Sequence, residues 1–263
     1  MEIDPAIRTR IDGILEGIEE REDVRLLFAI ESGSRAWGFP SPDSDYDVRF
    51  VYVRPLDWYL SLAPGRDVIE LPVDAVMDVN GWDVRKALSL LLKPNPVLLE
   101  WLDSPVRYRR DEGACEALRA LAAKVAHGPA CLHHYLHLTR KQWHKHIDGR
   151  ETVNLKRYFY VARPAMAIRW MRMHPETPPP MSFFDLREGI DLDPALSADL
   201  DRLLVLKSRA SESGDGARIA ALDAFVGAEL DWAAEAARRT PKPGPDLHGE
   251  AEALFRAIVK GQV

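Results

Sequence analysis

The chain of 263 residues is 46% hydrophobic and 29% charged, with a formal net charge of −6, the composition of an ordinary globular protein that can bury a core. The negative net charge argues against indiscriminate nucleic-acid binding by the whole surface. No apolar run approaches the ~18 residues of a membrane span. Two cysteines, Cys115 and Cys131, are too few for a disulfide scaffold or a zinc site. Since the N-terminal residues also lack the pattern of a signal peptide, we expect a cytoplasmic protein without a membrane partner.

The first hundred residues alternate between helical and strand patterns. Apolar residues at helical spacing begin the chain, and a short apolar run then predicts a buried strand. The predicted elements are a helix over 3–20, a strand over 24–30, a short helix over 34–37, a strand over 46–53, a helix over 55–62, one or two strands over 67–79, and helices over 82–92 and 95–102. This order predicts a small mixed β-sheet with flanking helices.

From Glu112 onward the strand patterns stop, and the helical pattern is interrupted only by turn-forming residues. Helices are predicted over 112–125, 129–147, 152–173, 196–211, 216–239 and 248–260. We therefore expect an α+β protein with two domains, an N-terminal lobe with the small mixed sheet over 1–110 and an all-α lobe over 111–263. Because ligand sites often lie where domains meet, we expect the active site in the cleft between them.

One segment carries the chemical signal. Gly33 and Ser34 follow an apolar run that ends at Ile30, and Asp45 and Asp47 come at a strand start shortly afterwards. Residues two apart on a strand share a face, so the two carboxylates would repel each other unless cations lie between them. In proteins, Mg²⁺ is held by one or two carboxylates together with the phosphates of a substrate. A glycine, which has no side chain, lets the backbone come close to such a phosphate. The pattern therefore indicates phosphoryl or nucleotidyl transfer, whereas the aspartate pair alone would suit a solvated edge strand.

The apolar–Gly–Ser pattern followed by Asp-x-Asp resembles the signature of the DNA polymerase beta nucleotidyltransferase superfamily. The stretches 33–39 (Gly-Ser-Arg-Ala-Trp-Gly-Phe), 43–50, 80–88 and 154–164 resemble one subgroup, the RNA repair pathway DNA polymerase beta family. The resemblance is dense over about 26–101 and fades beyond about 185. It implies an EC 2.7.7-type enzyme that transfers a nucleoside monophosphate from an NTP to an acceptor hydroxyl and releases pyrophosphate.

The superfamily adds a third carboxylate on a neighbouring strand. Asp74 and Asp78 both fit, but they lie about 13 Å apart along an extended strand, so only one of them can reach the metals. We assign Asp78, which stands just before the next helix, and keep Asp74 as the alternative. The resemblance thus implies Asp45, Asp47 and Asp78 as catalytic residues and ligands of two Mg²⁺ ions, for which Mn²⁺ can substitute.

The resemblance also implies a phosphate site at the Gly-Ser pair. Ser34, with the backbone of the preceding glycine, would bind a phosphate oxygen of the triphosphate. Arg35 is either a phosphate clamp or a partner of Asp43 or Glu31. Ser44 either contributes to the nucleotide site or shapes the turn that contains it.

The segment 131–174 is strongly basic, with nine Lys or Arg residues against two acids and six of the eight histidines. In related nucleotidyltransferases, a lysine and an aromatic residue on the first long helices of the second lobe hold the triphosphate and the base. Lys156 and Tyr160 match that pair, and Asn154 is a candidate for reading the base or sugar. The alternative is a solvated helix face. The histidines lack a carboxylate or cysteine that would complete a metal site, and they are candidates for facing nucleotide or RNA.

Two aromatic residues near the motif have two interpretations. Trp37 and Phe39 could stack on a base, but aromatic side chains beside a strand more often belong to the core, which we favour. The family resemblance suggests an RNA end as the acceptor. The alternatives are a protein or small-molecule hydroxyl, as in antitoxin-like or antibiotic-modifying relatives, and a non-catalytic domain that binds nucleotide or RNA.

Overall fold

The computed structural model describes residues 3–63, 65–74, 76–93, 95–125, 127–209, 214–238 and 244–263. These residues form a mixed α+β protein of two compact units. The first unit consists of Met1–Ala36, Asp45–Ala126 and Gly244–Val263, and the second of Trp37–Ser44 and His127–Pro243. This division differs from the expected boundary at residue 110, because the helix after that point and the C-terminal helix both belong to the first unit.

The first unit is built on a five-stranded sheet in the order β3-β4-β2-β1-β5. Its elements are α1 (Pro5–Glu22), β1 (Arg25–Glu31), α2 (Gly33–Ala36), β2 (Tyr46–Val53), α3 (Leu56–Tyr59), β3 (Val68–Glu70), β4 (Met77–Asp83), α4 (Val84–Leu92), α5 (Pro96–Leu102), β5 (Arg107–Arg110), α6 (Glu112–Ala122) and α12 (His248–Val259). Strands β2 and β4 run parallel, and the other neighbouring strands are antiparallel. The predicted mixed sheet with flanking helices is confirmed.

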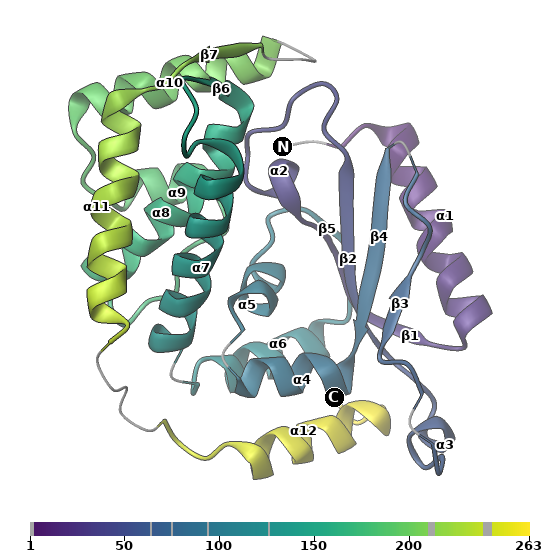
Figure 1. The fold of residues 1–263 in the computed structure, drawn as a ribbon. Helices are drawn as coiled ribbons and strands as arrows, with labels where there is room; N and C mark the ends of the chain where they lie inside the picture. Colours follow the sequence, from purple (N-terminus) through teal and green to yellow (C-terminus); the bar gives the residue numbers. More distant parts are fainter. Residues whose placement is uncertain are drawn as a thin grey trace. The chain divides into compact units, whose positions relative to one another are not determined.

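Helices cover both faces of this sheet. On one face, Val48, Phe50 and Tyr52 of β2 pack in a core cluster with α1, which Figure 1 draws in purple beside the sheet. On the other face, Val51 and Val53 pack in a cluster with α4, α5, α6 and α12. Each large apolar side chain that is fully buried in this way contributes about 1.5–3 kcal/mol. The alternation along β2 therefore places Asp47 and Arg49 on the α4 side of the sheet, where both side chains are only partly buried.

Two local features of the first unit differ from the sequence prediction. Strand β5 was not predicted, because three of its four residues are arginines and only Tyr108 is buried. Strand β4 continues to Asp83, so Trp82 lies in the strand and not in the following helix. Asp83 is the N-cap of α4, where its carboxylate accepts the Arg85 N–H at 2.8 Å, as expected of an acidic residue at a helix start.

The second unit is mainly helical and encloses α8 between other helices (Figure 1). Its elements are α7 (Gly128–His146), β6 (Thr152–Asn154), the 3-10 helix η1 (Leu155–Arg157), α8 (Tyr158–Met173), α9 (Phe183–Glu188), α10 (Pro194–Arg209), β7 (Asp215–Ala217) and α11 (Ala220–Ala236). No helix among the described residues has the length and apolar character needed to cross a membrane.

The prediction of a purely helical C-terminal part was wrong in one respect. Strands β6 and β7 pair antiparallel, with Val153 opposite Gly216. The predicted helix over 152–173 therefore begins only at Tyr158, and the helix predicted over 216–239 begins at Ala220. Three-residue strands are too short to show an alternating pattern, so the sequence alone could not reveal them.

Candidate active site

Gly33 and Asp47 lie in direct contact. Gly33 has a φ of +59°, and a Cβ placed on it would stand 1.9 Å from Asp47 Oδ2. A side chain at position 33 would therefore be strained and would also collide with the carboxylate. The Ser32 N–H donates to the Asp47 carbonyl at 2.8 Å, which fixes the two segments together. The structure thus brings the Gly-Ser motif and the Asp-x-Asp motif to one place in the first unit.

Asp47 and Asp78 are register partners on the parallel strands β2 and β4. Neighbouring residues in register share a sheet face, so both half-buried carboxylates point to the side opposite the α1 core. Asp45 immediately precedes β2 and is exposed, and its carbonyl accepts the Arg35 Nε–H at 3.2 Å.

The guanidinium of Arg49 bridges the two register partners. Its Nη2 lies 3.0 Å from Asp47 Oδ1 and 2.6 Å from Asp78 Oδ2, and its Nη1 donates to the Asp78 carbonyl at 2.7 Å. Arg49 lies two residues beyond Asp47 on β2 and so shares its face of the sheet, and no role for it was predicted from the sequence. The positive charge of Arg49 therefore offsets the repulsion between the two carboxylates.

The electrostatics of Asp47 reflect the same crowding. Burial raises the pKa of Asp47, Arg49 opposes the shift, and the negative charges of Asp78 and Asp45 add to it. A carboxylate whose ionised form is disfavoured by burial and by like charges gains from any further cation brought close.

A further acidic residue, Glu31, contacts the backbone of Asp47 and is fully buried. Glu31 accepts the Tyr108 hydroxyl at 2.6 Å and the Asp47 N–H at 2.9 Å. Burial raises the pKa of Glu31 to about 7, and these two hydrogen bonds oppose the rise. Its contact with the Asp47 backbone means that Glu31 supports the strand segment that carries the aspartates.

Asp74, the alternative third carboxylate, is bound elsewhere. It pairs with Arg10 of α1 at 2.6 Å, and its Oδ1 accepts the N–H groups of Val76 and Met77. This is the bonding of a turn-forming aspartate. Of the two candidates, Asp78 is therefore the one that the fold places beside Asp47.

The donor set suits a hard cation. Asp47 and Asp78 offer carboxylate oxygens side by side, and Mg²⁺ is usually held by one or two carboxylates with substrate phosphates and water completing its shell. Within the part of the chain that the structure describes, no group of three or more His, Cys, Asp or Glu side chains is arranged to hold a metal ion without such help.

The other residues expected near the Gly-Ser motif have defined local contacts. Ser34 is buried in the short helix α2, and the guanidinium of Arg35 stacks 3.8 Å from the Tyr46 ring centroid. In the second unit, Ser44 Oγ accepts the Ser41 N–H at 2.9 Å, so Ser44 does shape its turn. Whether these residues also touch a nucleotide stays a prediction.

The three residues expected to bind nucleotide in the second unit follow one another along the chain. Asn154 ends β6, Lys156 lies in η1, and Tyr160 lies in the first turn of α8. The side chain of Lys156 contacts both carboxylate oxygens of Asp43, at 3.1 and 3.2 Å. The sequence predicted Lys156 and Tyr160 on one α-helix, but the structure places Lys156 in η1, before α8 begins.

Aromatic side chains surround this segment. Phe39 is buried and stacks on Phe159 with ring centroids 4.8 Å apart, so the core interpretation of Phe39 is confirmed. Trp37 is half-buried, meets Tyr160 edge-on at 6.0 Å and lies under the Arg163 guanidinium at 4.7 Å. This cluster and its neighbouring cations were not recognised as a group from the sequence, because its members lie far apart in the chain.

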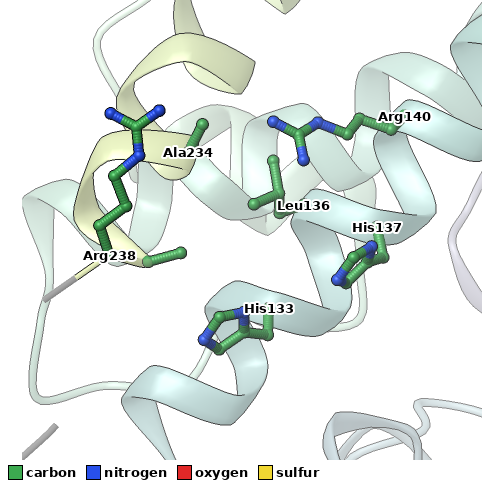
Figure 2. A pocket seen from close by; sticks show the side chains of 7 residues that line it. His133, Leu136, His137, Arg140, Ala234 and Arg238 are labelled. Carbon is green, nitrogen blue, oxygen red and sulfur yellow. The ribbon is translucent and has the colours of Figure 1, made fainter. Parts of the chain in front are cut away.

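Among the residues that the structure describes, the histidines of α7 belong to no group of side chains arranged to hold a metal ion. His144 is exposed and bonds Asp148 at 2.8 Å. His133 and His137 line a surface pocket of about 280 Å³ together with two arginines, Arg140 on α7 and Arg238 just beyond the end of α11 (Figure 2). The pocket is open to solvent, and whether its histidines face nucleotide or RNA stays a prediction.

Comparisons with known proteins show the family to which the chain belongs. The chain belongs to the RNA repair pathway DNA polymerase beta family, whose model matches residues 7–257. The resemblance seen in the sequence is therefore confirmed, and membership indicates a protein of the nucleotidyltransferase type. A curated relative, the uncharacterized protein YcgL of Bacillus subtilis (strain 168), is 40% identical over 254 residues, which cover 97% of each chain.

Similarity to a solved structure is weaker. A nucleotidyltransferase-like protein from Exiguobacterium sibiricum 255-15 aligns with 96% of this chain and 89% of its own, at 11% identity. The TM-score of 0.27 is too low for the alignment to support an argument about fold or activity.

Proposed function

We propose that this protein is a metal-dependent nucleotidyltransferase that moves a nucleoside monophosphate from an NTP to an acceptor hydroxyl and releases pyrophosphate. The observation that carries the proposal is the pairing of Asp47 with Asp78 on adjacent strands, with Gly33 against the Asp47 carboxylate. The family to which the chain belongs supports the same class of reaction.

In this proposal Asp45, Asp47 and Asp78 hold two Mg²⁺ ions, or Mn²⁺ in their place. Bound Mg²⁺ would supply charge neutralisation for the phosphates and would lower the pKa of the acceptor hydroxyl. The protein's own task is to hold the reacting groups in line. Asp78 is the proposed acceptor of the proton from the attacking hydroxyl. Arg49 contacts both Asp47 and Asp78, so a metal held by these two carboxylates would compete with the Arg49 guanidinium for them.

Two sets of residues are assigned to nucleotide binding. Gly33 and Ser34, at the start of α2, would take a phosphate oxygen, with Arg35 and Ser44 nearby in the sequence. Lys156 would hold the β and γ phosphates, because a lysine contacts phosphate as a compact charge with three donors. Tyr160 would contact the base and Asn154 the base or sugar.

The acceptor we propose is an RNA end, since RNA repair is the process after which the family is described. Transfer to a protein or small-molecule hydroxyl uses the same metal site, so the acceptor is decided by experiment. The protein is incubated with Mg²⁺ and each of four labelled NTPs, with RNA ending in a 3′-hydroxyl, with the same RNA blocked at its 3′ end, or with cell extract.

We expect label on the open RNA end only. Label on extract proteins or on small molecules, and not on RNA, would show that the acceptor is one of these. Failure of every acceptor to take label, while NTP still binds, would favour a non-catalytic nucleotide-binding domain. The Asp47→Asn variant is the matched control, because it keeps the shape of the side chain and removes its charge.

A further inference from the structure

Lys207 of α10 is a buried amine to which the proposed reaction gives no role. Only 3% of the residue is exposed. Its Nζ lies 4.3 Å from the ring centroid of Phe39, with the rings of Phe159 and Tyr160 at 5.4 and 5.6 Å. The negative faces of aromatic rings attract a cation, but they do not replace the hydration that an ammonium group loses on burial. Among the described residues, no carboxylate forms a salt bridge with Lys207.

Other charges lie within electrostatic reach of this amine. Burial and, after it, the positive charges of Lys156 and Arg157 lower the pKa of Lys207 to about 8, against the opposing effect of the negative charge of Asp43. The charges of Lys156 and Lys207 therefore repel each other. An anion held between them would relieve the repulsion and restore the charged form of Lys207.

Asp43 provides such an anion from within the chain. Both of its oxygens contact Lys156 Nζ, at 3.1 and 3.2 Å. Hydrogen bonding to Ser41 and then the contact with Lys156 hold the pKa of Asp43 below its usual range, so the carboxylate is ionised. The carboxylate is 47% exposed while the Lys156 side chain is only 16% exposed. A solvent ligand can therefore compete with Asp43 for the lysine from the outside.

We propose that Lys156 and Lys207 form a polyphosphate-binding pair, and that Asp43 is a tethered anion that occupies this pair until a polyphosphate displaces it. The inference rests on the role proposed for Lys156 and adds two elements to it. Lys207 becomes a second binding residue for the triphosphate of the NTP. Asp43 becomes an internal competitor, whose contact with Lys156 breaks as the contact of Lys156 with phosphate forms.

The test measures binding of inorganic tripolyphosphate, by titration calorimetry in the presence of a chelator, so that it depends on neither metal nor catalysis. Asp43→Asn should bind roughly three- to tenfold more tightly than the wild type, because the competitor has lost its charge. Lys207→Met, which keeps the length and packing of the side chain, should bind roughly tenfold more weakly. Lys141→Met, an exposed lysine of α7, is the control for general positive charge and should change binding little.

Two results would overturn the inference. Unchanged or weaker binding by Asp43→Asn would mean that Asp43 orients Lys156 and does not compete with the ligand. Wild-type affinity in Lys207→Met would remove Lys207 from the site. Circular dichroism shows whether Lys207→Met folds. If it does not, the inference is tested by Asp43→Asn alone and by the double variant Asp43→Asn with Lys156→Met. The gain in affinity of Asp43→Asn must vanish in the double variant, because Lys156 is then absent.

Failure of this inference can be told apart from failure of the proposed function. The expected binding pattern without any transfer product would leave the polyphosphate site standing and would reject nucleotidyl transfer. Normal transfer with wild-type polyphosphate binding in every variant would reject the lysine pair and leave the proposed reaction intact.

Discussion

Arg49 contacts Asp78 twice, donating from Nη2 to its carboxylate at 2.6 Å and from Nη1 to its carbonyl at 2.7 Å, while the same Nη2 also contacts Asp47. One side chain thus ties β2 to β4 and neutralises the carboxylates that we assign to metal. The stability of the metal-free protein and its affinity for metal should therefore respond to Arg49 in opposite directions.

Replacing Arg49 with Met should lower the melting temperature in the presence of a chelator, because it leaves two neighbouring carboxylates uncompensated, at a cost of about 1–3 kcal/mol. Mg²⁺ should then raise the melting temperature of the variant more than that of the wild type. Thermal unfolding with and without Mg²⁺ measures both effects. Arg10→Met is the matched control, since Arg10 pairs with Asp74 away from this site. An equal Mg²⁺ response in wild type and Arg49→Met would contradict the assignment of metal to Asp47 and Asp78.

Replacing Asp45 or Asp47 with Asn should abolish transfer and leave the fold intact. The charge stabilisation that a bound metal supplies is worth several kcal/mol, and each ~1.4 kcal/mol is tenfold in rate. Since burial disfavours the ionised form of Asp47, Asp47→Asn should unfold at a slightly higher temperature than the metal-free wild type. Transfer assays and thermal unfolding test the two parts separately. Near-normal activity in either variant would end the two-metal interpretation.

Asp78→Ala should abolish activity, whereas Asp74→Ala should leave it. Asp74 accepts the N–H groups of Val76 and Met77, so its loss should lower the unfolding free energy slightly. Activity at saturating NTP and chemical denaturation separate the two effects. The reverse outcome, with activity lost only in Asp74→Ala, would show that the third carboxylate was assigned to the wrong residue.

Lys156→Ala should weaken binding of an NTP more than binding of the corresponding NMP. A lysine directed at the β and γ phosphates contacts groups that the monophosphate lacks, and a charge-assisted hydrogen bond contributes roughly 1.5–3 kcal/mol, or about ten- to a hundredfold in affinity. Calorimetric titration of both nucleotides measures the difference, with exposed Lys141→Ala as control. Small and equal losses for the two nucleotides would mean that this segment only supplies general positive potential.

The stability of the protein should rise with pH above 8 because of Lys207. Its pKa falls from 10.5 in the unfolded chain to about 8 in the folded one. The free-energy cost of burying the charged amine therefore applies in full below pH 8, and it decreases as the pH rises towards 10.5. Between pH 7 and pH 9.5 this gain amounts to about 2 kcal/mol of unfolding free energy. Denaturation across that range should show the gain in wild type and in Lys141→Met but not in Lys207→Met. A constant difference between wild type and Lys207→Met would contradict the lowered pKa.

The sequence by itself determined the alternation of β2 and the likeness of the Gly-Ser and Asp-x-Asp segments to a known family. Both are local patterns: side chains two apart share a strand face, so Val48 and Phe50 had to be buried if Asp47 and Arg49 were not. The structure agrees on each of these residues. Local pattern failed where elements were short or charged, as in β6, β7 and the arginine-rich β5.

Only the tertiary structure decided which distant residues meet. The register of β2 against β4 places Asp78, and not Asp74, beside Asp47, and the 1.9 Å approach at Gly33 explains why a glycine stands there. The contact of Asp43 with Lys156 spans 113 positions of the chain. The burial of Lys207 among the rings of Phe39 and Phe159 likewise joins residues far apart in sequence. Such contacts depend on how helices and strands pack, and packing follows from the fit of whole surfaces, which no short stretch of sequence encodes.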